Sequence, residues 1–166
     1  MNIKQRRIFG VIFSVAFFLL AGQAGFSQSG KELAITAARA YETAPLDKST
    51  ADLRSKALKW VIETDEVSIV ACGEIFTLFS DKKNKNSSDM TGAYMLGMAA
   101  FKLENPDKSG DENAVQQAGL GTALKAYEGI VKEKPKTKND AIETLLTRRN
   151  NGELATIVAA SNCKKK

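Results

Sequence analysis

The chain contains no histidine, and its 166 residues include only two cysteines, three prolines and one tryptophan. Histidine is the commonest general base and the commonest zinc ligand, so its absence excludes Ser-His and Cys-His catalytic arrangements. Two cysteines alone cannot complete a closed zinc site. We therefore expect no catalytic residue, no metal site and no cofactor. Paired carboxylates are the chemistry that the composition leaves open.

The acidic residues lie mostly on charged helix faces or in turns such as Thr64-Asp65-Glu66. No pair of them has neighbours apolar enough to raise a carboxyl pKa, as a general acid requires. We therefore predict that the protein is not an enzyme. A carboxylate-dependent cell-wall hydrolase is the less favoured alternative.

Residues 107–113 place oxygen-bearing side chains at alternate positions, as a calcium loop does. The glycine comes too early for such a loop, however, and Ala118 stands where the closing glutamate belongs. We interpret the segment as the start of a helix, with Ser109 or Asp111 as its cap.

The first 27 residues have the pattern of an export signal. Three basic residues precede a mostly apolar run of 14 residues, Ile8 to Ala21. A membrane-spanning helix needs about 20 apolar residues, so we predict a cleaved signal peptide and not an anchor. Small residues allow cleavage after Ala24 or after Ser27, and we favour Ser27. Since Gln23 to Gln28 contains no cysteine for a lipid anchor, the mature protein, residues 28–166, is expected to be periplasmic or secreted, without stable membrane insertion.

The positive charge of the chain belongs largely to this signal. Residues 1–27 hold three of the 24 basic residues and none of the 19 acidic ones, so the net charge falls from +5 to +2 on cleavage. Nine of the 21 remaining basic residues lie in the last 35 residues: Lys132, Lys134, Lys136, Lys138, Arg148, Arg149 and Lys164 to Lys166. No aromatic residues are interleaved with them, so we expect no nucleic-acid partner. We interpret them as a solvated surface, with contact to an anionic envelope surface as the alternative.

Cys72 and Cys163 are expected to form a disulfide, because an exported protein meets an oxidising compartment. The bridge would close a loop of roughly 90 residues and remove on the order of 4 to 5 kcal/mol of unfolded-state entropy in the simple chain model. It would tie the C-terminal helix to the middle of the fold. Two free thiols, one of them buried, are the alternative.

Apolar residues recur at helical spacing nearly throughout the mature chain, and no alternating run with turn signals indicates a sheet. The predicted class is all-α: one domain of about six to seven helices in antiparallel pairs, as a helical bundle or a short repeat array. The predicted helices cover approximately residues 31–43, 49–63, 67–79, 89–103, 111–134, 140–150 and 153–161.

Two of these helices carry specific expectations. Residues 67–79 are the most apolar part of the mature chain, and we predict that they form the buried central helix carrying Cys72. Val67 to Ala71 could instead start a strand. In the long helix over 111–134, Gly119 and Gly121 are expected to weaken the helix and could mark a break.

Two stretches resemble the helices of the tetratricopeptide repeat. Tyr94-Met95-Leu96-Gly97-Met98-Ala99-Ala100-Phe101 is similar to its first helix, and Ala123-Leu124-Lys125-Ala126-Tyr127 followed by Pro135 is similar to its second. Lys102 to Thr122 separates them by about 14 residues more than a repeat of about 34 would allow. The resemblance covers Gly92 to Pro135, and it implies a helical array with a concave protein-binding surface and no chemistry.

Five large side chains are candidates for a groove that binds an apolar partner, although core packing is the interpretation that we favour for them. They are Tyr94, Met95, Met98, Phe101 and Tyr127. The predicted function is that of an exported, non-enzymatic protein that binds another envelope protein as a module or scaffold. A small periplasmic immunity or inhibitor protein is the alternative in the same compartment.

Overall fold

The structure is a computed structural model that describes residues 29–161 and 163. Within these residues the protein is all-α, as predicted, with seven α-helices and no strand. The helices are α1 (Gly30–Thr43), α2 (Ala51–Glu63), α3 (Gly73–Ser80), α4 (Ser87–Glu104), α5 (Glu112–Glu133), α6 (Asp140–Asn150) and α7 (Leu154–Ala160). Three short 3₁₀ segments join them: η1 (Lys48–Thr50), η2 (Pro106–Lys108) and η3 (Pro135–Thr137). The expected export signal and its cleavage site lie outside the described residues.

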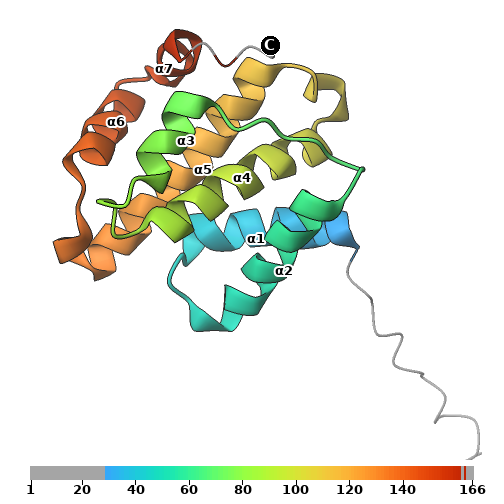
Figure 1. Cartoon of the computed structure of the whole chain (residues 1–166), viewed down its shortest axis with the longest axis horizontal. Coiled ribbons are helices and arrows are strands. Elements are labelled where there is room, and N and C mark those ends of the chain that lie inside the picture. The colour runs from blue at the N-terminus through green and yellow to red at the C-terminus, as the bar shows by residue number, and fades with distance from the viewer. Residues whose placement is uncertain (1–28, 162, 164–166) are drawn as a thin grey trace, which may run out of the picture.

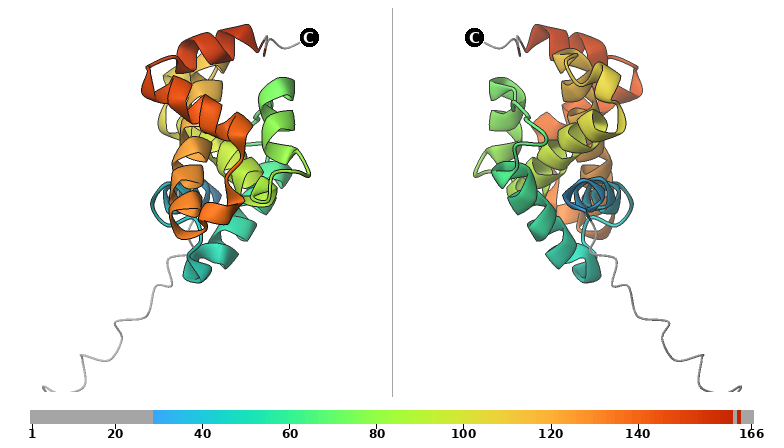
Figure 2. Two further views of the ribbon diagram at one scale, coloured as in Figure 1. Left: turned by 90° about the vertical axis from the view of Figure 1, so that its left-hand side faces the viewer. Right: turned by 90° about the vertical axis from the view of Figure 1, so that its right-hand side faces the viewer.

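Helices α4 and α5 form the centre of the fold. They pack along each other in opposite directions, and α1 crosses both of them, as Figures 1 and 2 show. Helix α2 lies outside α1 and α4, whereas α3 packs on α4 and α7 packs on α5. Because α1 contacts α5 across three intervening helices of the chain, the packing is that of a bundle around one buried helix pair.

Three of the seven α-helices in the described residues, α1, α5 and α6, begin where a short polar side chain caps them. The Ser29 hydroxyl accepts a hydrogen bond from the Glu32 amide, and the Glu32 carboxylate accepts one from the Ser29 amide, so α1 starts with a capping box. Asp111 caps α5 by accepting from the Ala114 amide at 3.1 Å. The predicted helix start near residue 111 is therefore confirmed. Helix α6 is capped by Asn139, one residue before its predicted start.

The helix predicted over 67–79 is wrong in its first half. Residues 67–72 are not helical, and α3 begins only at Gly73 with Cys72 as its N-cap residue. Helix α3 is not central either, since it lies on the outside of α4 and buries only Ile75 and Phe79.

Hydrogen bonds with side chains of the central pair explain why residues 67–72 do not form a helix. The Gln116 amide donates to the Val70 carbonyl, and the Cys72 amide donates to the Tyr94 hydroxyl at 3.3 Å. These bonds satisfy backbone groups that a helix would otherwise pair. Isoleucine and valine have restricted side-chain rotation, so the local helix propensity that opposes this arrangement is small.

The long helix predicted over 111–134 has no break at Gly119 or Gly121, because α5 is continuous from Glu112 to Glu133. Its Gly119 faces α4: a Cβ atom there would lie 2.5 Å from Met98 Cγ and 2.8 Å from the Tyr94 carbonyl oxygen. On α4, a Cβ atom at Gly97 would lie 3.0 Å from the Gly119 Cα. These glycines therefore set how closely α4 and α5 approach.

The predicted disulfide is confirmed. Cys72 and Cys163 are bonded with an S–S distance of 2.05 Å across a sequence separation of 91. The bridge fixes the segment after α7 to the residue that caps α3. A segment beside α4 and a segment beside α5 are thus joined covalently.

Replacing both Cys72 and Cys163 by alanine should lower the free energy of unfolding by about 2–4 kcal/mol, because the unfolded chain regains the entropy of a long open loop. Guanidinium titrations followed by circular dichroism measure the change. A reductant should destabilise the unaltered protein and leave the double variant unaffected. Equal midpoints for the two proteins under oxidising conditions would contradict a stabilising bridge.

Gly119→Ala and Gly121→Ala should have opposite effects, although they lie two residues apart on α5. We expect Gly119→Ala to destabilise by about 1–2 kcal/mol, because overpacking against α4 outweighs the helix propensity of alanine. An added Cβ at Gly121 would have no side chain and no atom of another helix within 4 Å, so the substitution should stabilise the protein by up to about 1 kcal/mol. Thermal and guanidinium unfolding measure both. Stabilisation by both substitutions would show that α4 and α5 are not in tight contact.

Candidate functional site

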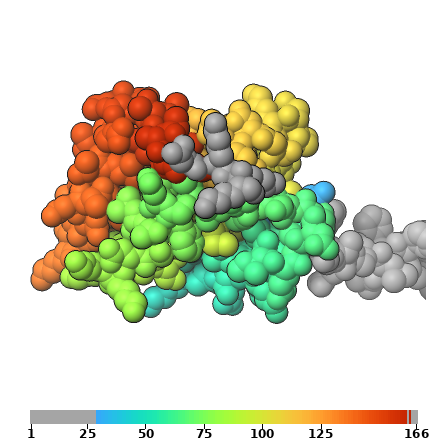
Figure 3. Space-filling model, turned by 45° about the horizontal axis from the view of Figure 1, so that its top comes forward, coloured from blue at the N-terminus to red at the C-terminus, as the bar shows by residue number. Residues whose placement is uncertain are grey.

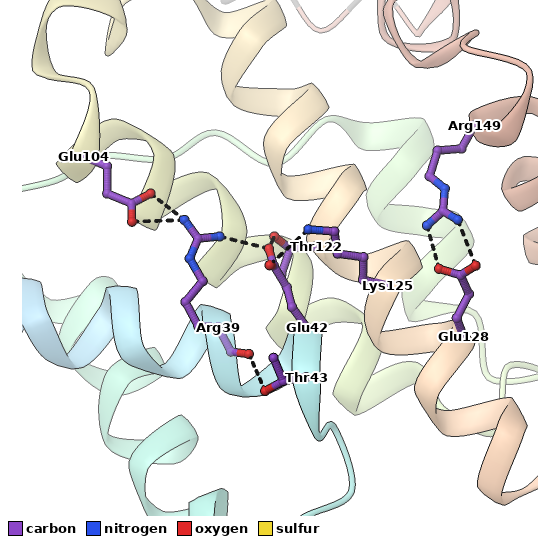
Figure 4. Close-up of polar contacts among 8 residues, drawn as sticks. All are labelled: Arg39, Glu42, Thr43, Glu104, Thr122, Lys125, Glu128 and Arg149. Carbon is purple, nitrogen blue, oxygen red and sulfur yellow. Dashed lines mark hydrogen bonds and ion pairs between the residues drawn. The ribbon is translucent and has the colours of Figure 1, made fainter.

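One surface region joins charged side chains from α1, α4 and α5, as Figure 4 shows. The Arg39 guanidinium donates to both carboxylate oxygens of Glu104, at 2.9 and 2.7 Å, and to Glu42 at 3.0 Å. Glu42 also accepts from the Thr122 hydroxyl at 2.7 Å and from Lys125 Nζ at 3.1 Å. We call these five residues the Glu42 network. It connects the crossing helix α1 to both helices of the central pair.

The Glu42 network borders a pocket of about 230 Å³ between the three helices. Its other lining residues are Gly97, Phe101, Ala118 and Gly121. The cations of this pocket already have carboxylate partners within the network, which favours a structural clamp over a site for a charged ligand. The network therefore explains how α1 is held in place.

The carboxyl group of Glu42 is held in its ionised form. Burial opposes ionisation, but hydrogen bonds from Thr122 and Lys125 and the charges of Lys125 and Arg39 outweigh it and lower the Glu42 pKa below 4.5. A carboxylate hydrolase needs one carboxyl group with a raised pKa as its general acid. Glu42 has the opposite property.

A second region is apolar and lies where α2 meets α4. Ile62 is 70% exposed there, beside the partly buried Leu58 and Met95, with Gly92 beneath them. We call these four residues the α2–α4 apolar surface. A Cβ atom at Gly92 would lie 2.7 Å from the Tyr41 hydroxyl of α1 and 3.1 Å from Leu58 Cδ1, so the glycine leaves room on α4 for both side chains.

Two hollows meet at this apolar surface. One has a volume of about 350 Å³ and is rimmed by hydroxyl groups, those of Ser80, Ser87, Ser88 and Thr91, with no charged residue in its lining. The other has a volume of about 370 Å³ and continues past Ile62 toward Val67 and Ile69. Ile62 and Met95 line both hollows, so they form the ridge between them.

The five candidate groove residues, for which core packing is the favoured interpretation, do not share one surface. Tyr94, Met98 and Tyr127 are fully buried in the core. Met95 belongs to the α2–α4 apolar surface, whereas Phe101 lines the pocket of the Glu42 network. The most exposed member of the apolar surface, Ile62, was not among the candidates. Its signal was present in the sequence, since it is an aliphatic residue outside the inward-facing positions of its helix.

The two buried tyrosines among these residues, Tyr94 and Tyr127, make structural hydrogen bonds. The Tyr94 hydroxyl donates to Gln116 Oε1, and the Tyr127 hydroxyl donates to the Glu143 carboxylate at 2.8 Å. Burial raises the pKa of each to about 12. Both tyrosines therefore stay neutral donors at any ordinary pH, and neither is free to contact a ligand.

No protein-family model, curated protein or solved structure matches this chain. Among residues 29–161 and 163, no three acidic or cysteine side chains gather as they would to hold a metal ion. In the same part of the chain, no helix is both long enough and apolar enough to cross a membrane. The charges and shapes of the two surface regions are therefore what indicates a function.

Glu42→Gln should lower the free energy of unfolding by about 1–2 kcal/mol at pH 7, because it removes charge-assisted hydrogen bonds whose two charged donors, Arg39 and Lys125, are half exposed. Since the Glu42 pKa is lower in the folded state, this contribution is present above pH 4.5 and is lost as the pH falls through the folded-state pKa. Guanidinium titrations at pH 7, 5 and 3 should show the difference shrinking.

Glu63→Gln is the matched control for this prediction. Its ion pair with Lys59 is 4.0 Å long and both side chains are largely exposed, so the change should stay below about 0.5 kcal/mol. Equal effects of the two substitutions at pH 7 would mean that the Glu42 network does not clamp the helices.

Proposed function

We propose that this chain is an exported, non-enzymatic helical protein that binds another protein of the cell envelope. The observation that carries the proposal is the α2–α4 apolar surface, where Ile62 is 70% exposed between two hollows. A single exposed aliphatic side chain is ordinary on a protein surface. An exposed one that forms a ridge with a second apolar side chain, over pockets that can receive a partner's side chains, is typical of a binding site.

The chemistry around the ridge favours a protein as the ligand. The centres of protein interfaces are depleted of charged residues and are surrounded by polar groups. The hollow beside Leu58 has this composition, since its rim consists of hydroxyl side chains. Met95 adds a flexible, unbranched side chain that can adapt to a partner.

The frame beneath the ridge supports tight binding. The Cys72–Cys163 disulfide and the Glu42 network hold α1, α4 and the α3 start in fixed positions. A surface that is already ordered loses little conformational entropy when it binds. The tetratricopeptide resemblance favours the same role, because its two halves lie on the packed pair α4 and α5, and Met95 belongs to the first half.

A small inhibitor or immunity protein is a specific form of this proposal. The disulfide-bonded frame favours it, since inhibitors commonly present a rigid surface to one enzyme. The partner would then be an enzyme whose activity is lost at a one-to-one ratio with this protein. A scaffold would leave its partner active.

A photo-crosslinking residue in place of Ile62 should capture the partner in living cells, whereas the same residue in place of Ala155, on the exposed side of α7, should not. Ile62→Glu should then weaken binding of the captured protein by about 30-fold, as expected for a central apolar contact. Ala155→Glu adds the same charge elsewhere and should leave affinity unchanged. Affinities come from calorimetry with the purified pair.

Two outcomes would overturn the proposal. One is equal capture from positions 62 and 155. The other is capture of only a second copy of this chain, which would make the ridge a self-association surface. In the same cells, an N-terminus that begins after Ala24 or Ser27 would support export.

A further inference from the structure

Two lysine-rich segments far apart in the sequence lie side by side. Residues 81–86 connect α3 to α4, and residues 132–138 lead from α5 through η3 toward α6. Lys85 Nζ donates to the Lys136 carbonyl at 3.3 Å, and the Asn86 side-chain amide donates to the Thr137 carbonyl at 3.1 Å. Figure 3 shows the light-green loop against the orange turn at one edge of the molecule. We call residues 81–86 and 132–140 the lysine end.

The first segment is anchored from below by two asparagines. Asn84 and Asn86 are buried, and the Asn84 side chain donates to the Phe79 carbonyl at 2.9 Å and accepts from the Asn86 amide at 3.0 Å. The lysines between and beside them all point outward. The exposed lysines of the lysine end are Lys82, Lys83, Lys85, Lys132, Lys134, Lys136 and Lys138. Of the ion pairs found in the described residues, only that of Lys138 with Glu143, at 3.6 Å, involves this set.

The lysine end differs in charge from the rest of the molecule. Its seven lysines accompany three acidic residues, Asp81, Glu133 and Asp140, so it carries +4. The mature chain predicted above carries a net charge of +2, so the part of it outside the lysine end carries −2. This uneven distribution of charge is an observation separate from those made on the α2–α4 apolar surface.

We propose that the lysine end docks the protein electrostatically on an anionic phospholipid surface. All of its cations are lysines, which act as hydrated point charges and suit a diffuse layer of negative charge better than the bidentate pairing that arginine gives at shaped protein interfaces. None of the pockets described above is lined by these lysines. The two segments contain no aromatic or aliphatic side chain apart from Pro135, so contact stays at the headgroups without insertion.

The test measures how the protein, purified in the form that accumulates in cells, sediments with lipid vesicles. The vesicles contain 30% phosphatidylglycerol in phosphatidylcholine. We expect sedimentation with these vesicles at low salt, none with pure phosphatidylcholine, and release by 0.5 M NaCl. Each lysine near an anionic membrane contributes about a fivefold factor in partitioning, so the Lys82→Gln, Lys83→Gln, Lys136→Gln variant should bind roughly 100-fold more weakly. Lys85 is left unaltered because its amino group bonds the Lys136 carbonyl.

The control variant carries Lys56→Gln, Lys59→Gln and Lys108→Gln. These lysines are also exposed and the net charge changes equally, so binding should stay within about threefold of the unaltered protein. All three proteins share one N-terminus, and any contribution from residues 1–28 cancels. The salt dependence of the unaltered protein is a second test that needs no variant.

Several results would overturn the proposal. They are absence of binding to the anionic vesicles at low salt, equal loss of binding in the two variants, and displacement by 10 mM inorganic phosphate. Soluble polyglutamate that binds more tightly than the vesicles would also overturn it, because the occupant would then be an acidic polypeptide.

Discussion

The close approach of α4 and α5 at Gly97 and Gly119 is the constraint on which the remaining packing depends. Neither glycine can carry a Cβ without moving backbone or core atoms of the facing helix. With the two backbones this close, the large side chains beside them interdigitate, and Tyr94 is fully buried. Its hydroxyl then reaches Gln116 and the Cys72 amide. The extended segment before α3, and with it the disulfide, is therefore placed by the spacing of the central pair.

The outer helices are held by different forces, and this difference explains where the apolar surface lies. The Glu42 network fixes α1 to both central helices. Helix α2 packs on α1 and α4 through one side only, and its buried residues are Arg54, Ala57 and Val61. Among the helices of residues 29–161, no further one covers α2, so Ile62, the neighbour of buried Val61, is exposed. The exposure of Ile62 thus follows from the position of α2 at the edge of the bundle.

The sequence predicted helices well where the caps are local. Ser29 and Asp111 are followed by apolar residues at helical spacing, and both cap helices as such residues do. It failed at residues 67–72 because their conformation is decided by Gln116 and Tyr94, which lie over 20 residues further along the chain. The sequence also left open a break at Gly119, where glycine instead has a packing role and does not end the helix.

The same distinction applies to the surfaces. An aliphatic residue outside the inward-facing positions of its helix, such as Ile62, can be recognised in the sequence. The hollows beside it cannot, because they arise from the contact of two helices. The lysines of residues 132–138 form a cluster that can be seen in the sequence. That they lie beside the lysines of residues 82–85 follows from the tertiary structure, in which the Asn86 side chain donates a hydrogen bond to the Thr137 carbonyl. Charge patches assembled from two loops are tertiary features, and no local pattern reports them.

The two surfaces share a segment of the chain, and this relates the two proposals. Ser80 and Ser87 rim the hollow of the α2–α4 apolar surface, and the residues between them carry three of the lysines of the lysine end. Docking through these lysines would hold the ridge of Ile62 and Met95 beside a membrane. The rest of the mature chain carries a net charge of −2, so an anionic surface would attract the lysine end more strongly than the rest of the protein. A partner at the membrane surface would then meet the apolar ridge from the side.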